Sequence, residues 1–199
     1  SGTQNTAIGH QTMNQHNISG NYNTALGANS YRNSSSMSGS YNTCVGYGAN
    51  LSANNSSGQM TLGNGEVSNL RCNDTSISSL SDQRDKTEIV DSPFGLSFIN
   101  SLRPVQFKWK RRRLTPVEMR NGYKDSNNGK VRVGFIAQEL QTAQNNISSV
   151  TKDILNLVQE DNPNRLEAKQ GNLLPVAIKA IQELSVKVEA LVKRVAALE

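Results

Sequence analysis

The hydrophobic positions at the start of the chain recur at a fixed interval. Ser-Gly pairs begin at residues 1, 19, 38 and 57, so the spacing is 18, 19 and 19 residues. The first three pairs lead to Asn-Thr-Ala-Ile-Gly, Asn-Thr-Ala-Leu-Gly and Asn-Thr-Cys-Val-Gly, and the fourth leads to a shortened Thr-Leu-Gly. Self-similarity at about 20 residues is typical of stacked repeats. The regular period argues against the alternative, a disordered linker rich in Asn and Ser.

One repeat unit contains only two or three apolar side chains, so it needs its neighbours to build a core. Its apolar pair is too short for a helix, and a following Gly permits a corner with positive φ. We therefore expect residues 1–64 to form a β-rich coil of short stacked strands. The larger apolar residues that we expect to face the shared interior are Ile8, Leu26, Val45 and Leu62.

The hydrophobic positions at the end of the chain follow a heptad. One seam position holds Leu174, Ile181, Val188 and Val195, and the other holds Ala177, Leu184, Leu191 and Leu198. This alternation of three and four predicts a coiled-coil helix over residues 173–199, with Pro175 tolerated in its first turn. β-branched residues at the first position with Leu at the second would by themselves favour a dimer.

The middle of the chain has mixed patterns. Residues 65–80 alternate only loosely, which predicts an extended junction. In residues 81–172 a helix-like stretch runs from Asp91 to Pro104, a strand pattern covers 105–110, and a return strand covers 131–135. A helix begins at residue 137. This region therefore predicts a small α+β body between the coil and the C-terminal helix.

Composition argues for self-association. The chain has 5% aromatic and 35% hydrophobic residues, which is low for a compact monomer of 199 residues. Such a chain buries enough surface by repeating or by associating with its own copies. No stretch approaches the roughly 20 apolar residues that span a bilayer, and no signal peptide opens the sequence. Because the chain starts inside a repeat, we expect it to be part of a longer protein.

The charge is uneven along the chain. Residues 1–80 hold two basic and two acidic residues, whereas residues 81–199 hold 19 basic and 14 acidic ones. A basic chain makes nucleic acid a possible partner. However, the basic run 110–113 has no aromatic stacking platform in the sequence, which favours a solvated hairpin end and no nucleic acid.

The metal-binding residue types are few. The cysteines Cys44 and Cys72 and the histidines His10 and His16 show no metal-ligand spacing. We expect both thiols to be small core residues, and we expect no metal and no cofactor.

Three motifs follow the junction in order. The first is Ser81-Asp82-Gln83-Arg84-Asp85-Lys86, the second is Gly-Phe-Ile-Ala-Gln-Glu at 134–139, and the third runs from Leu-Leu-Pro at 173–175 to Lys-Ala-Ile-Gln-Glu-Leu at 179–184. Taken alone, Ser81 before a charged run would be an ordinary helix cap. Together the motifs resemble the C-terminal intramolecular chaperone domain of phage endosialidases and tail fibres, a domain also found in the myelin regulatory factor.

The resemblance implies a self-cleaving serine endopeptidase that acts once. Ser81 would be the nucleophile that attacks the carbonyl of Leu80, so that the cut falls between Leu80 and Ser81. Lys86 would be the general base, with Asp82 and Arg84 in support, Asp82 pairing with Arg84 or capping the following turn. Because no His follows residue 16 and no Cys follows residue 72, a Ser-His-Asp or Cys-His arrangement within the C-terminal domain is excluded. Asp85 stands where the family commonly has an aliphatic residue.

The repeats resemble the heads of trimeric autotransporter adhesins and viral tail fibres, with a longer spacing here. Both resemblances imply a homotrimer, which differs from the dimer that the heptad alone favours. They imply a chaperone that folds the upstream fibre or spike domain of its own chain and is then released. The fibre would belong to the virion and could bind a host surface receptor, while the released fragment stays in the host cytoplasm. The alternative is a structural or receptor-binding fibre tip that is not cleaved.

Overall fold

A computed structural model describes residues 2–14, 17–32, 36–74, 76–110, 129–147 and 149–198. Residues 111–113 of the basic run and His16 lie outside the described residues. The chain forms two compact units, one built mainly from residues 1–71 and the other mainly from residues 72–106, 133–159 and 166–199. Each unit is described by itself below.

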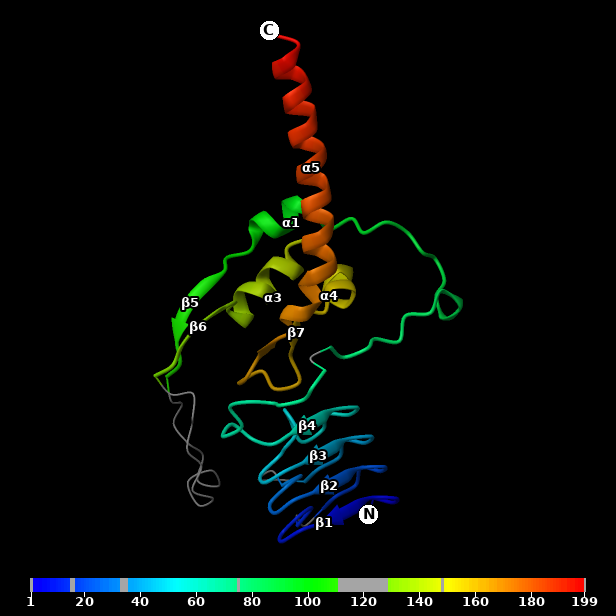
Figure 1. The fold of residues 1–199 in the computed structure, drawn as a ribbon. Helices are drawn as coiled ribbons and strands as arrows, with labels where there is room; N and C mark the ends of the chain where they lie inside the picture. Colours follow the sequence, from blue (N-terminus) through cyan, green and yellow to red (C-terminus); the bar gives the residue numbers. More distant parts are fainter. Residues whose placement is uncertain are drawn as a thin grey trace. The chain divides into compact units, whose positions relative to one another are not determined.

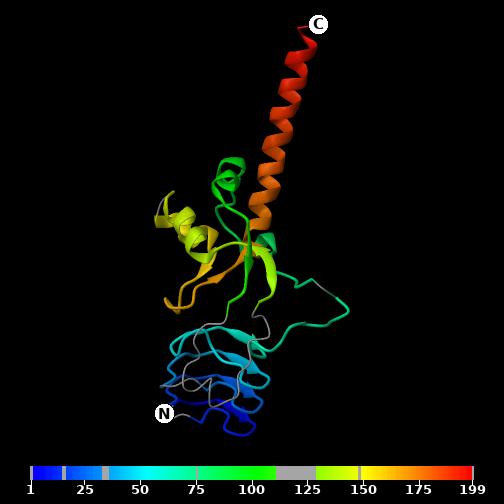
Figure 2. The same ribbon diagram turned by 90° about the vertical axis from the view of Figure 1, so that its left-hand side faces the viewer.

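Four three-residue strands stack in parallel in the first unit. They are β1 (Thr6–Ile8), β2 (Thr24–Leu26), β3 (Thr43–Val45) and β4 (Met60–Leu62). Each strand pairs with the next in chain order, and the views in Figures 1 and 2 show the resulting layers. Ala7 lies beside Ala25, and Ala25 beside Cys44. The partner of each residue is therefore the equivalent residue of the next repeat.

The interior of this stack is partly polar. Asn23 and Asn42 are completely buried, together with the apolar residues Ala25, Tyr31, Met37, Cys44 and Ala49. The Asn23 backbone N–H donates to Oδ1 of Asn5 at 2.8 Å, and its Nδ2 donates to the carbonyl oxygen of Gly39 at 3.0 Å. Asn42 repeats both bonds one layer further on. The buried amides are thus satisfied by neighbouring layers, as buried polar groups must be.

The single chain does not bury the apolar column that the sequence predicts for the shared interior. Ile8, Leu26 and Leu62 are about half exposed, and Val45 is half-buried. In the two middle strands the preceding residue, Ala25 or Cys44, is buried instead, because successive strand residues face opposite sides. The column therefore runs along the outside of one chain.

The two cysteines lie in different environments. Cys44 is buried in the stack, and burial raises the pKa of its thiol to about 11. Cys72 is exposed in the junction. The prediction that both thiols are core residues is therefore wrong for Cys72, which lies in a segment with no strand or helix to pack against.

Small residues allow the layers of the stack to approach closely. A Cβ atom added to Gly39 would lie 1.7 Å from the carbonyl oxygen of Ser56, and one added to Gly20 would lie 1.8 Å from that of Gly39. Only glycine fits at such a distance from the backbone of the next layer. The glycines of the first three Ser-Gly pairs are therefore sites of close packing, whereas a Cβ added to Gly58 would meet nothing within 4 Å.

The second unit is a small mixed α/β domain. It contains α1 (Leu96–Ser101), α3 (Ala137–Asn145), α4 (Ser149–Leu155), β7 (Val158–Gln159), β8 (Glu167–Ala168) and α5 (Leu174–Ala196). A short 3-10 turn, Gln170–Leu173, leads into α5. The strands β7 and β8 are antiparallel. Its core consists of Phe94, Phe98, Leu140, Leu155, Leu157, Val158, Leu173 and Val176. The predicted α+β body and long C-terminal helix are confirmed.

The first helix of this unit is shorter than predicted. It begins at Leu96 rather than near Asp91, because the cap comes from far along the chain. The Leu96 N–H donates to Oε2 of Glu183 on α5 at 2.8 Å, and the neighbouring Gly95 leaves room for that carboxylate. A carboxylate at a helix N-terminus satisfies a free backbone donor. Glu183 thus fastens α1 to α5.

The C-terminal helix presents two faces. Val176 and Ala180 are buried against the domain core. The predicted seam residues beyond them are exposed, from 49% for Leu184 to 87% for Leu198. These residues recur three and four positions apart, so they form an exposed apolar stripe along one side of the helix. None of the helices in the described ranges is long and apolar enough to cross a membrane.

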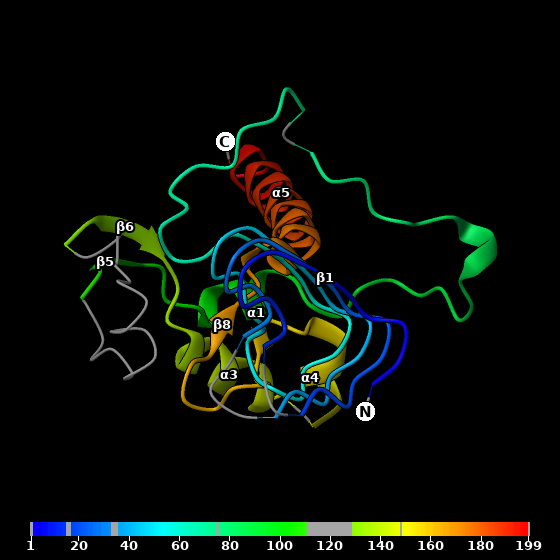
Figure 3. The same ribbon diagram turned by 90° about the horizontal axis from the view of Figure 1, so that it is seen from below.

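A two-stranded ribbon, β5 (Val105–Lys108) with β6 (Val131–Gly134), matches the predicted strand and its return, and Figure 3 shows the two side by side. Trp109 donates its N–H to the carbonyl oxygen of Lys130 at 2.9 Å, and Gly129 donates to that of Trp109 at 2.7 Å. Gly129 has φ +80°, so these bonds form a bulge that needs glycine at this position.

Candidate active site

A single tight turn follows the junction. Gln83–Asp85 form a 3-10 turn, and Asp82 caps it by accepting the Arg84 N–H at 2.9 Å. The Lys86 N–H closes the turn on the carbonyl oxygen of Gln83 at 3.1 Å. A 3-10 helix completes one turn in three residues, so the residues that flank the turn lie close to each other.

This turn places the predicted nucleophile and base in contact. Nζ of Lys86 lies 2.5 Å from Oγ of Ser81 and 3.4 Å from the Ser81 carbonyl oxygen. The interpretation of Ser81 as a helix cap is wrong, because Asp82 supplies the cap and Ser81 faces the lysine. A serine hydroxyl needs a neighbouring base to become a nucleophile, and this is the geometry that such a pair requires.

Asp82 and Arg84 form an ion pair within the same turn. Oδ2 of Asp82 lies 2.6 Å from a guanidinium nitrogen of Arg84. The Arg84 side chain holds the pKa of the Asp82 carboxyl below its usual range, and the carboxylate raises the pKa of Arg84. Because the pair is exposed to water, its contribution is mainly geometric. Asp82 thus both caps the turn and forms an ion pair with Arg84, directly beside Ser81 in the sequence.

The surroundings of the pair are aqueous in the single chain. Leu80 is fully exposed, and both Ser81 and Lys86 are exposed. The chain around them, residues 76–90, contains only the 3-10 turn. The described residues therefore leave the pair open to solvent.

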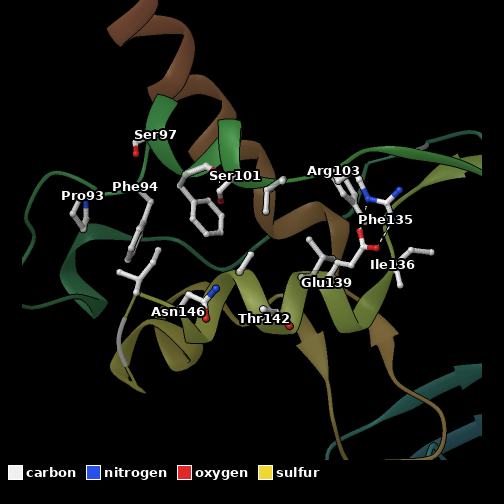
Figure 4. Close-up of a pocket in the computed structure, with 15 residues that line it drawn as sticks. Pro93, Phe94, Ser97, Ser101, Arg103, Phe135, Ile136, Glu139, Thr142 and Asn146 are labelled. Atoms are coloured by element: carbon white, nitrogen blue, oxygen red, sulfur yellow. Dashed lines mark hydrogen bonds and ion pairs between the residues drawn. The ribbon is translucent and has the colours of Figure 1, made fainter.

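A second candidate site is an open hollow of about 670 Å³ between α1 and α3. Its walls are apolar, with Phe94, Phe98 and Leu140, and Figure 4 shows the ion pair of Arg103 with Glu139 at one end. Glu139 raises the pKa of Arg103. Glu139 is the last residue of the second sequence motif. Its pairing with Arg103 could not be predicted from the sequence, because the two residues lie 36 positions apart. None of the predicted site residues lines this hollow.

The described parts of the chain contain no group of three His, Cys, Asp or Glu side chains that could hold a metal ion. The side chains of the turn offer a hydroxyl, an amine and a carboxylate–guanidinium pair.

The second unit combines a small mixed fold, a long amphipathic C-terminal helix and the capped turn that carries Ser81 and Lys86. Residues 81–151 match the family model described as the chaperone of endosialidase, which is grouped among the peptidases. This range contains the first two sequence motifs and supports the chaperone domain that they predict, whereas the third motif, at residues 173–184, lies beyond it. No curated protein and no solved structure matches the chain.

Proposed function

We propose that residues 81–199 assemble a homotrimeric viral fibre or spike and are then released by a cut between Leu80 and Ser81. The observation that supports the cut is the 2.5 Å contact between Nζ of Lys86 and Oγ of Ser81. The family match, which begins at Ser81, supports a domain that starts at the cut.

In the proposed reaction, Lys86 in its uncharged form accepts the proton of the Ser81 hydroxyl. Oγ of Ser81 then forms a bond to the carbonyl carbon of Leu80, and the carbon–nitrogen bond between Leu80 and Ser81 breaks. The proton passes from Lys86 to the departing amine. Water hydrolyses the resulting ester, which restores the serine hydroxyl and leaves a carboxylate on Leu80. Each chain carries out this reaction once.

Assembly would have to come before the cut. In the single chain the dyad is exposed, whereas a lysine base needs surroundings from which water is excluded. Two exposed apolar surfaces, the column from Ile8 to Leu62 and the seam of α5, supply a driving force for association of three chains. Stacked strands form non-local contacts slowly, so a helical trimer that forms first would keep the chains in register.

The proposal extends to partners and location. The chaperone acts on the upstream fibre or spike domain of its own chain, which becomes part of the virion, and the released fragment stays in the host cytoplasm. The exposure of Leu80, Ser81 and Lys86 favours a second candidate function, in which the chain stays whole as a structural or receptor-binding fibre tip.

A denaturing gel with intact-mass measurement tests the proposal. Freshly expressed protein should give two fragments of 80 and 119 residues. Ser81→Ala should give one uncut chain that still sediments as a trimer. The mechanism is wrong if the C-terminal fragment begins at a residue other than Ser81, or if the Ser81→Ala chain is still cut at this bond. An uncut wild-type trimer would favour the fibre tip.

A further inference from the structure

The part of the sequence that contains β5 and β6 is strongly basic. Residues 103–134 contain ten basic and two acidic residues, whereas the whole chain has a net charge of +5. The rest of the chain is therefore net negative. The basic residues on the described part of the ribbon are Lys108, Lys110, Lys130 and Arg132, and among the described residues none of them pairs with a carboxylate.

Part of the ribbon's backbone also lacks a strand partner among the described residues. There the sheet has two strands, which leaves one edge of each strand unpaired, and a two-stranded ribbon alone is only marginally stable in water. Its apolar side chains remain accessible, with Trp109 46%, Val131 49% and Val133 75% exposed. A further strand could pair with an open edge of the ribbon and cover these exposed side chains.

The segment after Lys86 has the complementary character. Thr87–Val90 is rich in β-branched residues, which favour strands, yet it is exposed and has no backbone hydrogen bond within the described part of the chain. The carboxylates of Asp85, Glu88 and Asp91 surround it at intervals of three residues and have no cation beside them among the described ion pairs. Arg84 and Lys86 are already engaged by Asp82 and Ser81.

We propose that Thr87–Val90 of one subunit adds as a third strand to the β5–β6 ribbon of a second copy of this chain. The neighbouring carboxylates would meet the basic residues of the ribbon, so charge complementarity as well as the strand edge selects the partner. A second copy is the occupant because the single chain leaves both surfaces open. This inference rests on the proposed trimer.

Docking of this kind would connect assembly to the cut. The docked segment begins one residue after Lys86, so it would immobilise the turn that holds the dyad. Exposed ion pairs are individually weak, and the strand is short. The contact therefore needs the high effective concentration that a trimer supplies, and it would form only after the chains have associated.

Cross-linking tests the docking without the cut. In a Cys72→Ser, Ser81→Ala background, Ile89→Cys combined with Val133→Cys should yield bands of two and three chains with a short bismaleimide, provided that sedimentation shows a trimer. Each single cysteine variant should yield few such bands. A link within one chain, or no link in a confirmed trimer, would overturn the docking, whereas the absence of a trimer would count against the proposed function instead.

Charge reversal tests the link to the cut. Lys108→Glu with Arg132→Glu should slow cleavage at least about tenfold and leave the trimer intact, and adding Glu88→Lys with Asp91→Lys should restore the rate. The matched control Arg71→Glu with Lys193→Glu reverses two exposed charges elsewhere and should cleave normally. Equal slowing by the control, or absence of rescue, would overturn the proposal. Nucleic acid that co-purifies with the wild type and is lost with the Lys108→Glu, Arg132→Glu variant would also overturn it.

Discussion

At the scale of single residues, the candidate site depends on a very local arrangement. Ser81 and Lys86 are five positions apart, and one capped turn brings their side chains to 2.5 Å. The cap is a carboxylate with a lowered pKa, so it stays charged and in place above its ordinary pKa and is lost only as the pH falls through the lower value. The turn should therefore keep its cap throughout the neutral and alkaline range.

The pH dependence of the cut follows from this. Cleavage in the assembled protein should slow as the solution is made more acidic, because a protonated amine cannot accept the serine proton. The lowered pKa of Asp82 keeps its carboxylate charged to a more acidic pH than that of an ordinary aspartate, so the loss reports the base and not the turn. The rate is measured by gel densitometry at several pH values. A rate that is constant down to about pH 5 would contradict a lysine base.

Substitution of the base gives a sharper test. Lys86→Arg keeps the charge and the length of the side chain, but a guanidinium stays protonated. We expect it to cut at least about a hundredfold more slowly than the wild type, like Lys86→Ala, while both variants still form trimers. Time courses on a denaturing gel measure this. An arginine variant that cuts at the wild-type rate would show that Lys86 only positions Ser81.

At the scale of the elements, the stacked strands depend on close contact between layers. Buried asparagine amides bond from each layer to the next, and glycine permits the approach of the backbones. The short strands alone offer three paired residues each. The asparagine bonds and glycine contacts outside the strands therefore help to set the distance between layers, as strand pairing does.

Gly39→Ala tests this directly. The added methyl group would lie 1.7 Å from the carbonyl oxygen of Ser56, so the two layers must separate. We expect a loss of about 3 kcal/mol or more in the free energy of unfolding of the stack, measured by circular dichroism during denaturation. Gly171→Ala is the matched control, because nothing lies within 4 Å of its added Cβ. Similar melting of both variants would contradict the close packing.

At the scale of the whole molecule, the exposed seam of α5 and the exposed column of the stack both remain unexplained by one chain. The helix uses Val176 and Ala180 to pack on its own domain, which leaves the seam free for other copies. Two separate apolar surfaces at the two ends of the sequence are consistent with a parallel assembly in which each end contacts its counterpart.

Leu184→Asp should abolish that assembly. A charge at a packed seam position would be buried without a partner in every copy, at a cost of about 3–5 kcal/mol each. We expect monomers by sedimentation and poor cleavage despite intact Ser81 and Lys86. Gln182→Asp, an exposed position outside the seam, should leave both properties unchanged. A Leu184→Asp protein that sediments like the wild type would exclude the seam as the interface.

The sequence by itself determined the features that depend on short-range spacing. The repeat interval indicated where β1 to β4 lie, the heptad indicated α5, and the alternation indicated β5 and β6, because side-chain direction along a helix or strand is set by its own period. The pairing of Ser81 with Lys86 is different: the resemblance to the chaperone family, and not the spacing, pointed to these two residues, and one capped turn then brings their side chains into contact.

Only the tertiary structure decided which surfaces those elements bury. Asn23 and Asn42 are core residues because the next layer supplies their hydrogen-bond partners. α1 begins late because its cap, Glu183, lies 87 residues further along the chain. Leu26 lies outside a single chain because Ala25 occupies the interior. For the asparagines and for α1 the deciding contact joins residues distant in sequence, and no local period predicts such a contact.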